Sequence, residues 1–227
     1  MISLQGVSKH YAKHKNQVVD EVSLEIKAGE FVSIVGQSGA GKTTLVKLLI
    51  GEERADKGKV IVGDWDITRL PKREVAFLRR QIGVIFQDFK LLPKKTLREN
   101  VAFALEVCGE KRGKIDKIVG SVLKIVGLED KKDRYPHEVS GGEQQRAAIA
   151  RALVHQPRIL LADEPTGNLD AINADEIIDL LIRINRFGTT VILVTHNKEI
   201  VNRLHRRVIT MEQGRVISDK EQGKYLL

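Results

Sequence analysis

A glycine-rich octapeptide offers the clearest chemistry in this chain. Residues 36–43 read Gly-Gln-Ser-Gly-Ala-Gly-Lys-Thr and fit the G-x-x-x-x-G-K-[ST] phosphate loop at every position. Glycines lack a Cβ atom, so this backbone can wrap closely around an anion and aim its N–H groups inward. Lys42 adds an ammonium for the β- and γ-phosphates, and Thr43 offers a hydroxyl to Mg²⁺. The pattern therefore predicts a nucleoside triphosphate site at Gly36, Gln37, Ser38, Gly39, Ala40, Gly41, Lys42, Thr43 and Thr44.

Two carboxylates follow a second apolar run, residues 159–162. Asp163 is expected to hold Mg²⁺ directly or through water. Side chains alternate along a strand, so Glu164 points elsewhere and could orient or deprotonate the attacking water. Alone, the pair could equally be an acidic turn in which Pro165 ends a strand. The intact phosphate loop favours the catalytic interpretation.

A second glycine-rich loop, Ser140-Gly141-Gly142-Glu143, also opens a predicted helix. A helix N-terminus attracts anions, which suggests another phosphate contact. Ser140 and Glu143 also have the spacing of a capping box, which would only stabilise the helix start. Spacing alone does not decide between these two interpretations.

Three single residues complete the candidate site. Gln87 ends one predicted strand and could reach the metal or the water with its amide, and His196 follows another and could hydrogen-bond a γ-phosphate. Tyr11 could stack on a nucleotide base. Each has a plainer explanation as a polar strand end, a structural histidine or an exposed loop tyrosine.

The surrounding elements would bring these residues together. Residues 31–35 form a β-branched run, and Leu45, Leu48 and Leu49 follow at helical spacing, so the phosphate loop joins a strand to a helix. Strand-like runs at 82–87, 158–162 and 189–195 alternate with helical patterns, which favours a parallel sheet covered by helices. The carboxyl ends of such strands form the usual ligand site.

Other segments depart from this alternation. Residues 2–7 and 17–26 predict antiparallel strands, and 207–211 with 214–218 predict a hairpin. Between Thr96 and Leu128 the pattern is helical throughout, so a helical subdomain is expected there. We expect one domain over residues 1–227, with its core at about 1–87 and 157–218, the helical subdomain at about 88–156, and a polar tail at 219–227.

Composition narrows the class of protein. The 227 residues are 42% hydrophobic and 30% charged, as in globular proteins. No apolar run approaches the length of a membrane span, and the N-terminus lacks the features of a signal peptide. Cys108 is the only cysteine, which suits a reducing cytoplasm. The net charge of +8 fits nucleic acid or an anionic membrane surface, although the basic residues are spread along the chain.

Taken in order, these motifs resemble those of the ATP-binding cassette family. The family's aromatic adenine contact, phosphate loop, Q-loop, signature loop, Walker B acid, D-loop and H-loop fall at Tyr11, 36–43, Gln87, 140–144, Asp163, 168–170 and His196. The signature Val-Ser-Gly-Gly-Glu-Gln-Gln-Arg over 139–146 is highly specific. Glu143 stands where many members have Gln, and Gly167-Asn168 replaces a commoner small pair. The resemblance covers essentially the whole chain.

This resemblance implies an α/β P-loop NTPase of the cassette type. It would have a RecA-like core, an N-terminal antiparallel β subdomain and a helical signature subdomain. ATP and Mg²⁺ would be the cofactors, with Thr43, Gln87 and Asp163 around the metal and Glu164, His196 and Gln87 catalytic. Two copies would pair head-to-tail, so that Ser140, Gly141, Gly142, Glu143 and Asp170 of one copy address the ATP held by the other.

Within the family, residues 87–105 are similar to the FtsE branch of bacterial cell-division cassettes. That branch pairs with the membrane protein FtsX and couples ATP hydrolysis to cell-wall hydrolases, which implies a position on the cytoplasmic face of the plasma membrane. No nucleic-acid partner is expected. Phe89, Leu91 and Leu92 would either dock the membrane partner or belong to the helical core. The alternatives are the ATPase of a lipoprotein-releasing or macrolide-type exporter, a soluble cassette protein, and an ATP-gated scaffold.

Overall fold

The computed structural model describes residues 1–11 and 17–225 of the chain. Its strands are β1 (Ile2–Lys9), β2 (Val19–Ile26), β3 (Phe31–Val35), β4 (Lys57–Val62), β5 (Trp65–Asp66), β6 (Ile82–Ile85), β7 (Ile159–Asp163), β8 (Thr190–Val194), β9 (Arg207–Glu212) and β10 (Arg215–Lys220). Its α-helices are α1 (Lys42–Leu49), α2 (Val75–Arg79), α3 (Leu97–Val107), α4 (Arg112–Ile125), α5 (Gly141–Leu153), α6 (Ala171–Arg186) and α7 (Lys198–Leu204). Short 3₁₀ helices lie at η1 (Lys72–Glu74), η2 (Glu129–Lys131) and η3 (Pro136–Glu138).

The larger sheet has six strands in the order β10-β9-β3-β8-β7-β6. Strand β3 is parallel to β8 and β9, and β7 is parallel to β6 and β8, as the alternating pattern predicts. Strands β3 and β8 are buried at every position, which explains their largely apolar sequences. The parallel arrangement gathers the carboxyl ends of β3, β7 and β8 at one edge.

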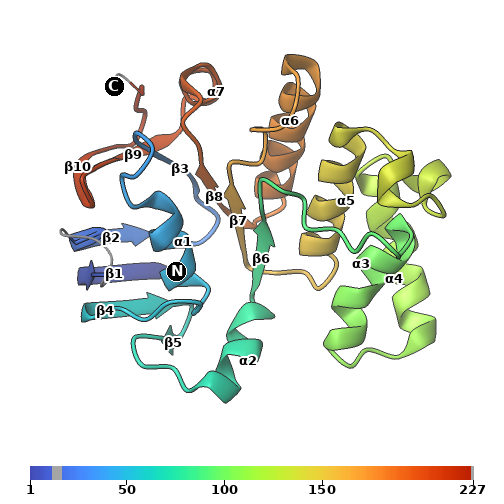
Figure 1. The fold of residues 1–227 in the computed structure, drawn as a ribbon, viewed down its shortest axis with the longest axis horizontal. Coiled ribbons are helices and arrows are strands. Elements are labelled where there is room, and N and C mark those ends of the chain that lie inside the picture. Colours follow the sequence, from blue (N-terminus) through green and yellow to red (C-terminus); the bar gives the residue numbers. More distant parts are fainter. Residues whose placement is uncertain (12–16, 226–227) are drawn as a thin grey trace.

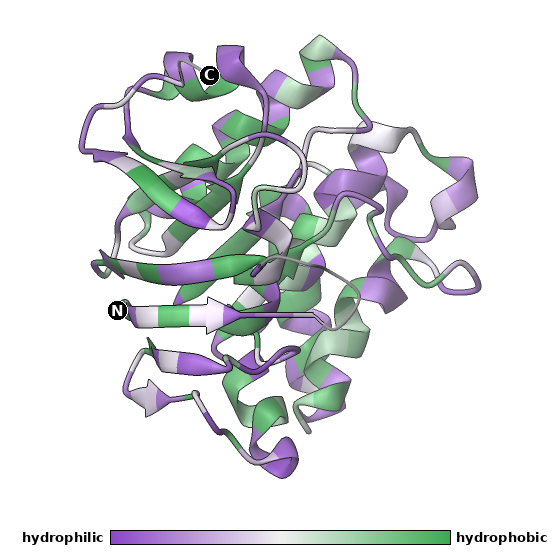
Figure 2. Ribbon diagram, turned by 60° about the vertical axis from the view of Figure 1, so that its left-hand side comes forward, coloured by the Kyte–Doolittle hydropathy of each residue, from purple (hydrophilic) through white to green (hydrophobic). Residues whose placement is uncertain are grey.

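A second sheet, ordered β2-β1-β4-β5, is antiparallel and lies beside α1 (Figure 1). Its pairing confirms the two antiparallel strands predicted near the N-terminus. Along β2, buried and exposed residues alternate, and Figure 2 shows the corresponding change between hydrophobic and hydrophilic segments. One face of this sheet therefore packs on the core while the other faces solvent.

Helices α3, α4 and α5 gather on the opposite side of the larger sheet from the small sheet (Figure 1). Helix α3 begins at Thr96, whose side chain accepts from the Glu99 backbone in a complete capping box. Leu97, Val101 and Leu105 of α3 are buried, so the 3.6-residue period places one apolar face inward. Burying each such leucine stabilises the fold by roughly 1.5–3 kcal/mol.

Two large apolar clusters hold these layers together. The first joins α1 and the small sheet to one face of the large sheet, and the second joins α3–α6 to the other face. Leu45, Leu48 and Leu49 of α1 are almost fully buried in the first cluster. The helix behind the phosphate loop is thus fixed from both sides. The subdomain boundaries themselves remain a prediction.

The C-terminal segment differs from the expected polar tail. Strand β10 continues through Lys220, and Tyr225 is 5% exposed, packed with Val35, Val201 and Val208. The Tyr225 backbone N–H also donates to Asn202 Oδ1 at 2.8 Å. Tyr225 therefore attaches this segment to the core, although the residues before it are polar. Among the residues that the structure describes, none of the helices has the length and apolar character needed to cross a bilayer.

Candidate nucleotide-binding site

The phosphate loop joins the end of β3 to the start of α1. Lys42 is buried, and its Nζ donates to the carbonyl oxygens of Gly36 at 2.7 Å and Gln37 at 3.0 Å. Burial lowers the pKa of Lys42, while the nearby carboxylates of Glu164 and Asp163 oppose that effect. The ammonium therefore lies folded over the loop, where bound phosphate oxygens could replace its carbonyl partners.

Glycine is required at two positions of this loop. Gly36 has φ 153° and Gly41 has φ 97°. A Cβ atom on Gly36 would lie 2.2 Å from the Met211 carbonyl oxygen, and one on Gly41 would lie 2.3 Å from that of Val18. The loop is thus pressed against neighbouring backbone, which fixes the direction of its N–H groups.

Asp163, the last residue of β7, provides the best test for a divalent cation. Its Oδ1 is buried and has no hydrogen-bond partner among the described residues, and Thr43 hydrogen-bonds the same side chain. Burial and the neighbouring Glu164 raise the pKa of Asp163, with Lys42 acting in the opposite direction. An unsatisfied buried carboxylate oxygen beside a hydroxyl suits a hard cation with oxygen ligands. These residues therefore fit Mg²⁺.

Glu164 adopts a left-handed backbone conformation, φ 49°, directly after β7. This turn places its carboxylate against the end of β8, where Oε1 lies 2.7 Å from His196 Nδ1 and Oε2 accepts from Thr195 Oγ1 at 3.2 Å. The Glu164 side chain is 16% exposed, whereas His196 is 67% exposed. The structure thus brings Glu164 and His196 together, as their positions at adjacent strand ends predict.

Gln87 follows β6 and contacts the loop beyond β7. Its Nε2 donates weakly to Asn168 Oδ1 at 3.5 Å, and Asn168 Nδ2 donates to the Gln87 carbonyl at 3.1 Å. A Cβ atom on Gly167 would lie 2.9 Å from Gln87 Nε2. The unusual Gly167-Asn168 pair therefore leaves space for, and holds, the glutamine.

A cavity of about 600 Å³ collects most of the predicted residues. It is lined by Val18, Gln37, Ser38, Gly39, Ala40, Gly41, Lys42, Thr43, Thr44, Gln87, Glu164, His196 and Tyr225. Tyr225 and Val18 were missed by the sequence reasoning, because neither belongs to a motif. Tyr11 follows β1, where the Lys9 ammonium lies 5.3 Å from its ring centroid.

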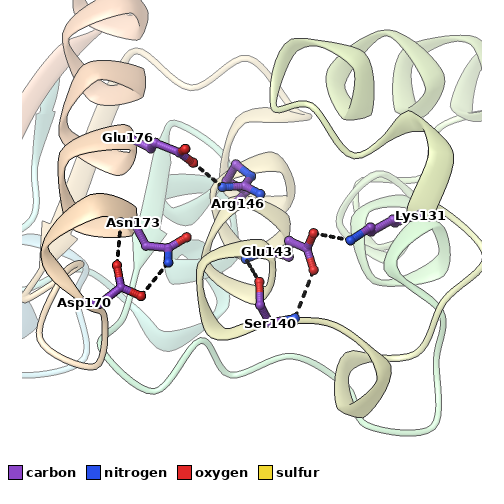
Figure 3. Close-up of polar contacts among 7 residues, drawn as sticks. All are labelled: Lys131, Ser140, Glu143, Arg146, Asp170, Asn173 and Glu176. Carbon is purple, nitrogen blue, oxygen red and sulfur yellow. Dashed lines mark hydrogen bonds and ion pairs between the residues drawn. The ribbon is translucent and has the colours of Figure 1, made fainter.

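The second glycine-rich loop does not line this cavity within the described parts of the chain. Ser140 caps α5, and its hydroxyl accepts from the Glu143 N–H at 3.3 Å while Glu143 Oε2 accepts from the Ser140 N–H at 2.9 Å (Figure 3). The capping box is therefore present. Glu143 also forms an ion pair with Lys131 of η2, and Arg146 pairs with Glu176 of α6 at 2.7 Å.

The start of α6 packs against this loop. Asp170 caps α6 and accepts from the backbone and side chain of Asn173 at 2.9 and 2.7 Å (Figure 3). These bonds lower the pKa of Asp170. A Cβ atom on Gly142 would lie 2.0 Å from Asn173 Oδ1, so a larger residue there would have to displace the Asn173 side chain. Asn173, which sequence reasoning missed, joins the two helix starts.

Two further polar residues of α5 were missed. Gln145 is fully buried and donates from Nε2 to the Pro165 carbonyl at 2.6 Å. Arg151 donates to the carbonyl oxygens of Lys90 at 2.6 Å and Phe89 at 2.9 Å, and burial lowers its pKa. Gln145 lies inside the signature and Arg151 follows it, but both look like residues of an ordinary polar helix face, so only the tertiary structure reveals their partners.

Comparisons with known proteins agree with this geometry. The ABC transporter family matches residues 19–167. A solved dimeric ATP-binding cassette in a post-hydrolysis state with ADP and Pi, MJ0796, superposes with a TM-score of 0.88 at 33% identity, covering 99% of this chain and all of that one. The chain belongs to the ATP-binding cassette family and is an ATPase with the P-loop fold.

Its curated relatives indicate which branch of the family the chain belongs to. The cell division ATP-binding protein FtsE of Streptococcus pneumoniae is 50% identical over 99% of this chain and 97% of its own length. FtsE of Bacillus subtilis is 48% identical over 99% and 98%. Within the cassette family, the chain therefore falls among the FtsE proteins.

Proposed function

We propose that this chain is the ATP-hydrolysing subunit of an FtsEX-like membrane complex in bacterial cell division, where ATP-driven closure regulates cell-wall hydrolysis through a membrane partner. The observation that carries the proposal is the match to FtsE proteins over nearly the full length at 48–50% identity, combined with the phosphate loop, Gln87, Glu164 and His196 around one cavity. ATP and water would yield ADP and phosphate. A position on the cytoplasmic face of the membrane follows from this role.

The motif residues in and beside the cavity each have a proposed place in this reaction. Lys42 and the loop N–H groups would bind the β- and γ-phosphates, since they lie together at the start of α1. Thr43, Asp163 and Gln87 would hold Mg²⁺, which when bound neutralises phosphate charge. Glu164 would orient and deprotonate the attacking water, and His196 would contact the γ-phosphate. Tyr11 is proposed as the adenine contact.

A second copy would complete the site. Residues 140–143 do not line the cavity of their own chain in its described parts, although their helix start suits an anion. In a head-to-tail pair, Ser140, Gly141, Gly142 and Glu143 would address the partner's ATP, with Asp170 beside them. The dimeric state of the solved cassette with ADP and Pi supports this arrangement.

The membrane partner needs a docking surface, for which Phe89, Leu91 and Leu92 are candidates. All three are half-buried, and Leu91 packs against the helical core. More exposed apolar side chains lie around a neighbouring groove of about 600 Å³ between α2 and α3, where Phe103 is 40% and Val107 is 61% exposed.

Among the described residues, this groove is lined by the cations Lys72, Arg79, Arg80 and Arg151 and by no acid. An acidic, amphipathic cytoplasmic helix of the partner would match it in charge and polarity. We therefore include the groove in the proposed docking surface.

Co-purification tests the role. The tagged chain is recovered from gently solubilised membranes, with Phe89→Asp, Leu92→Asp and Phe103→Asp as docking variants and exposed Ile217→Asp as the matched control. We expect an FtsX-like protein with the parent and the control, and its loss in the docking variants. An exporter permease would keep the ATPase chemistry and overturn the division role, and absence of any membrane protein would favour a soluble cassette.

A further inference from the structure

The start of α5 carries a negative charge at the place where an anion is expected. Glu143 is the third residue of this helix, and its side chain is 14% exposed. Its Oε2 already accepts the Ser140 N–H. The carboxylate thus accepts a hydrogen bond from one of the free backbone N–H groups that a helix start would otherwise offer to phosphate.

Glu143 is ionised at neutral pH. The hydrogen bond from Lys131 has the largest effect and lowers the pKa of Glu143; burial opposes it, and the bonds with Ser140 lower the pKa further. Like charges that approach each other in a partly buried interface repel strongly. A triphosphate delivered to this helix start by another copy would meet a full negative charge unless a cation compensates it.

Lys131 is that cation. Its Nζ pairs with Glu143 Oε1, the oxygen that the Ser140 N–H does not use (Figure 3). Arg146 lies on the same helix, but it is engaged by Glu176, and Arg134 lies 3.7 Å from Glu138. In the described part of the chain, Lys131 is the one cation in ion-pair contact with Glu143.

We propose that Lys131 is a positioning residue of this ATPase, which neutralises Glu143 so that the start of α5 can accept the triphosphate bound by a second copy. The inference rests on the proposed head-to-tail dimer. It explains how a glutamate is accommodated where many cassettes carry a neutral glutamine. It also assigns a function to η2, which otherwise only connects α4 to the signature.

The proposal predicts an energetic coupling between the two residues. Lys131→Met should raise the ATP concentration for half-maximal dimerisation about five- to tenfold, a modest change because Lys131 is half-exposed and screened. In a chain that already carries Glu143→Gln, Lys131→Met should change this ATP concentration by less than about twofold, because no uncompensated negative charge remains. Lys132→Met removes the neighbouring exposed cation and should behave as the parent.

Sedimentation with increasing ATP tests this coupling, using chains that also carry Glu164→Gln to slow hydrolysis. Lys131→Gln serves as a second variant, and Lys131→Arg should keep the parental ATP dependence. Higher salt should bring the ATP dependence of Lys131→Met closer to that of the parent, because salt screens the charge of Glu143. The loss of a purely structural contact would not show this salt dependence. Thermal unfolding without nucleotide separates folding from dimerisation.

The outcomes are distinct. Equal losses with Glu143 present and in the Glu143→Gln background, or no loss in either, overturn the role of Lys131 while leaving the ATPase dimer intact. Failure of the parent to dimerise with ATP overturns the proposed dimer, and this inference with it. A loss confined to chains that keep Glu143 supports the inference.

Discussion

The Glu164 carboxylate and the His196 imidazole contact each other at 2.7 Å, between Oε1 and Nδ1. Thr195 holds the other carboxylate oxygen, so the end of β8 fixes both oxygens of the proposed base. The contact occupies Nδ1 and leaves Nε2 of the exposed imidazole for a phosphate oxygen. In the proposed mechanism, the pair would link water activation to γ-phosphate contact through this one contact.

Glu164→Gln should bind ATP but lower turnover by about 10²–10⁴-fold, because an amide keeps the shape of the carboxylate and cannot take a proton. Phosphate release measures turnover, and nucleotide binding is measured separately by fluorescence or calorimetry. Glu199→Gln, an exposed change on α7, is the control. Parental turnover in Glu164→Gln would remove this residue from the mechanism.

Gly41→Ala should destabilise the chain by about 2–4 kcal/mol, because a new Cβ would collide with the Val18 carbonyl and the backbone would be strained. Gly39→Ala is the matched comparison, since its φ of 83° is also left-handed but nothing lies within 4 Å of its Cβ position. It should lose only about 1 kcal/mol. Denaturant unfolding without nucleotide measures the free energy of unfolding of both variants. Equal losses of stability would contradict the proposed collision at Gly41.

His155 should make stability depend on pH. Burial lowers its pKa below 6.5, and its Nε2 has no partner among the described residues. The unfolded chain then binds more protons, so stability is retained above pH 6.5 and falls as the pH drops through this value toward the lower folded pKa. His155→Asn should therefore lose less stability than the parent between about pH 7.5 and about pH 5.5. Identical pH profiles from urea unfolding would refute this assignment.

Arg151→Met should loosen the segment after Gln87. The guanidinium binds the carbonyls of Phe89 and Lys90, which both have positive φ, so their strained turn depends on it. We expect a loss of about 1.5–3 kcal/mol and faster amide exchange across 88–92. Arg158→Met, at an exposed arginine, should change neither measurement. Unchanged amide exchange across 88–92 in Arg151→Met would show that this turn is stable without the arginine.

Much of the fold follows from local patterns. The apolar runs before Gly36 and Asp163 predict buried parallel strands because covered sheets need apolar residues on both faces. Leu45, Leu48 and Leu49 predict the buried face of α1 by their period alone. The phosphate loop and the acidic pair could be placed at one edge because parallel strands share their direction.

The missed residues depend on contacts between distant segments. Gln145 and Asn173 look like ordinary polar helix residues, and only the packing of α5 on α6 and on the loop after β7 gives them partners. Tyr225 lies in a polar stretch without periodicity, yet it reaches the cavity. The roles assigned to the site residues remain predictions until the variants above are measured.

The bond between Gln145 and Pro165 has a mechanical consequence. It ties the helix that would read another copy's nucleotide to the peptide directly after Glu164, which would act on the chain's own nucleotide. Both groups are buried or nearly so, and breaking the bond would leave a polar atom unsatisfied, so the two parts resist moving separately. In a symmetric pair, this hydrogen bond would couple hydrolysis at one site to hydrolysis at the other. The hydrolysis rate would then depend sigmoidally on the ATP concentration.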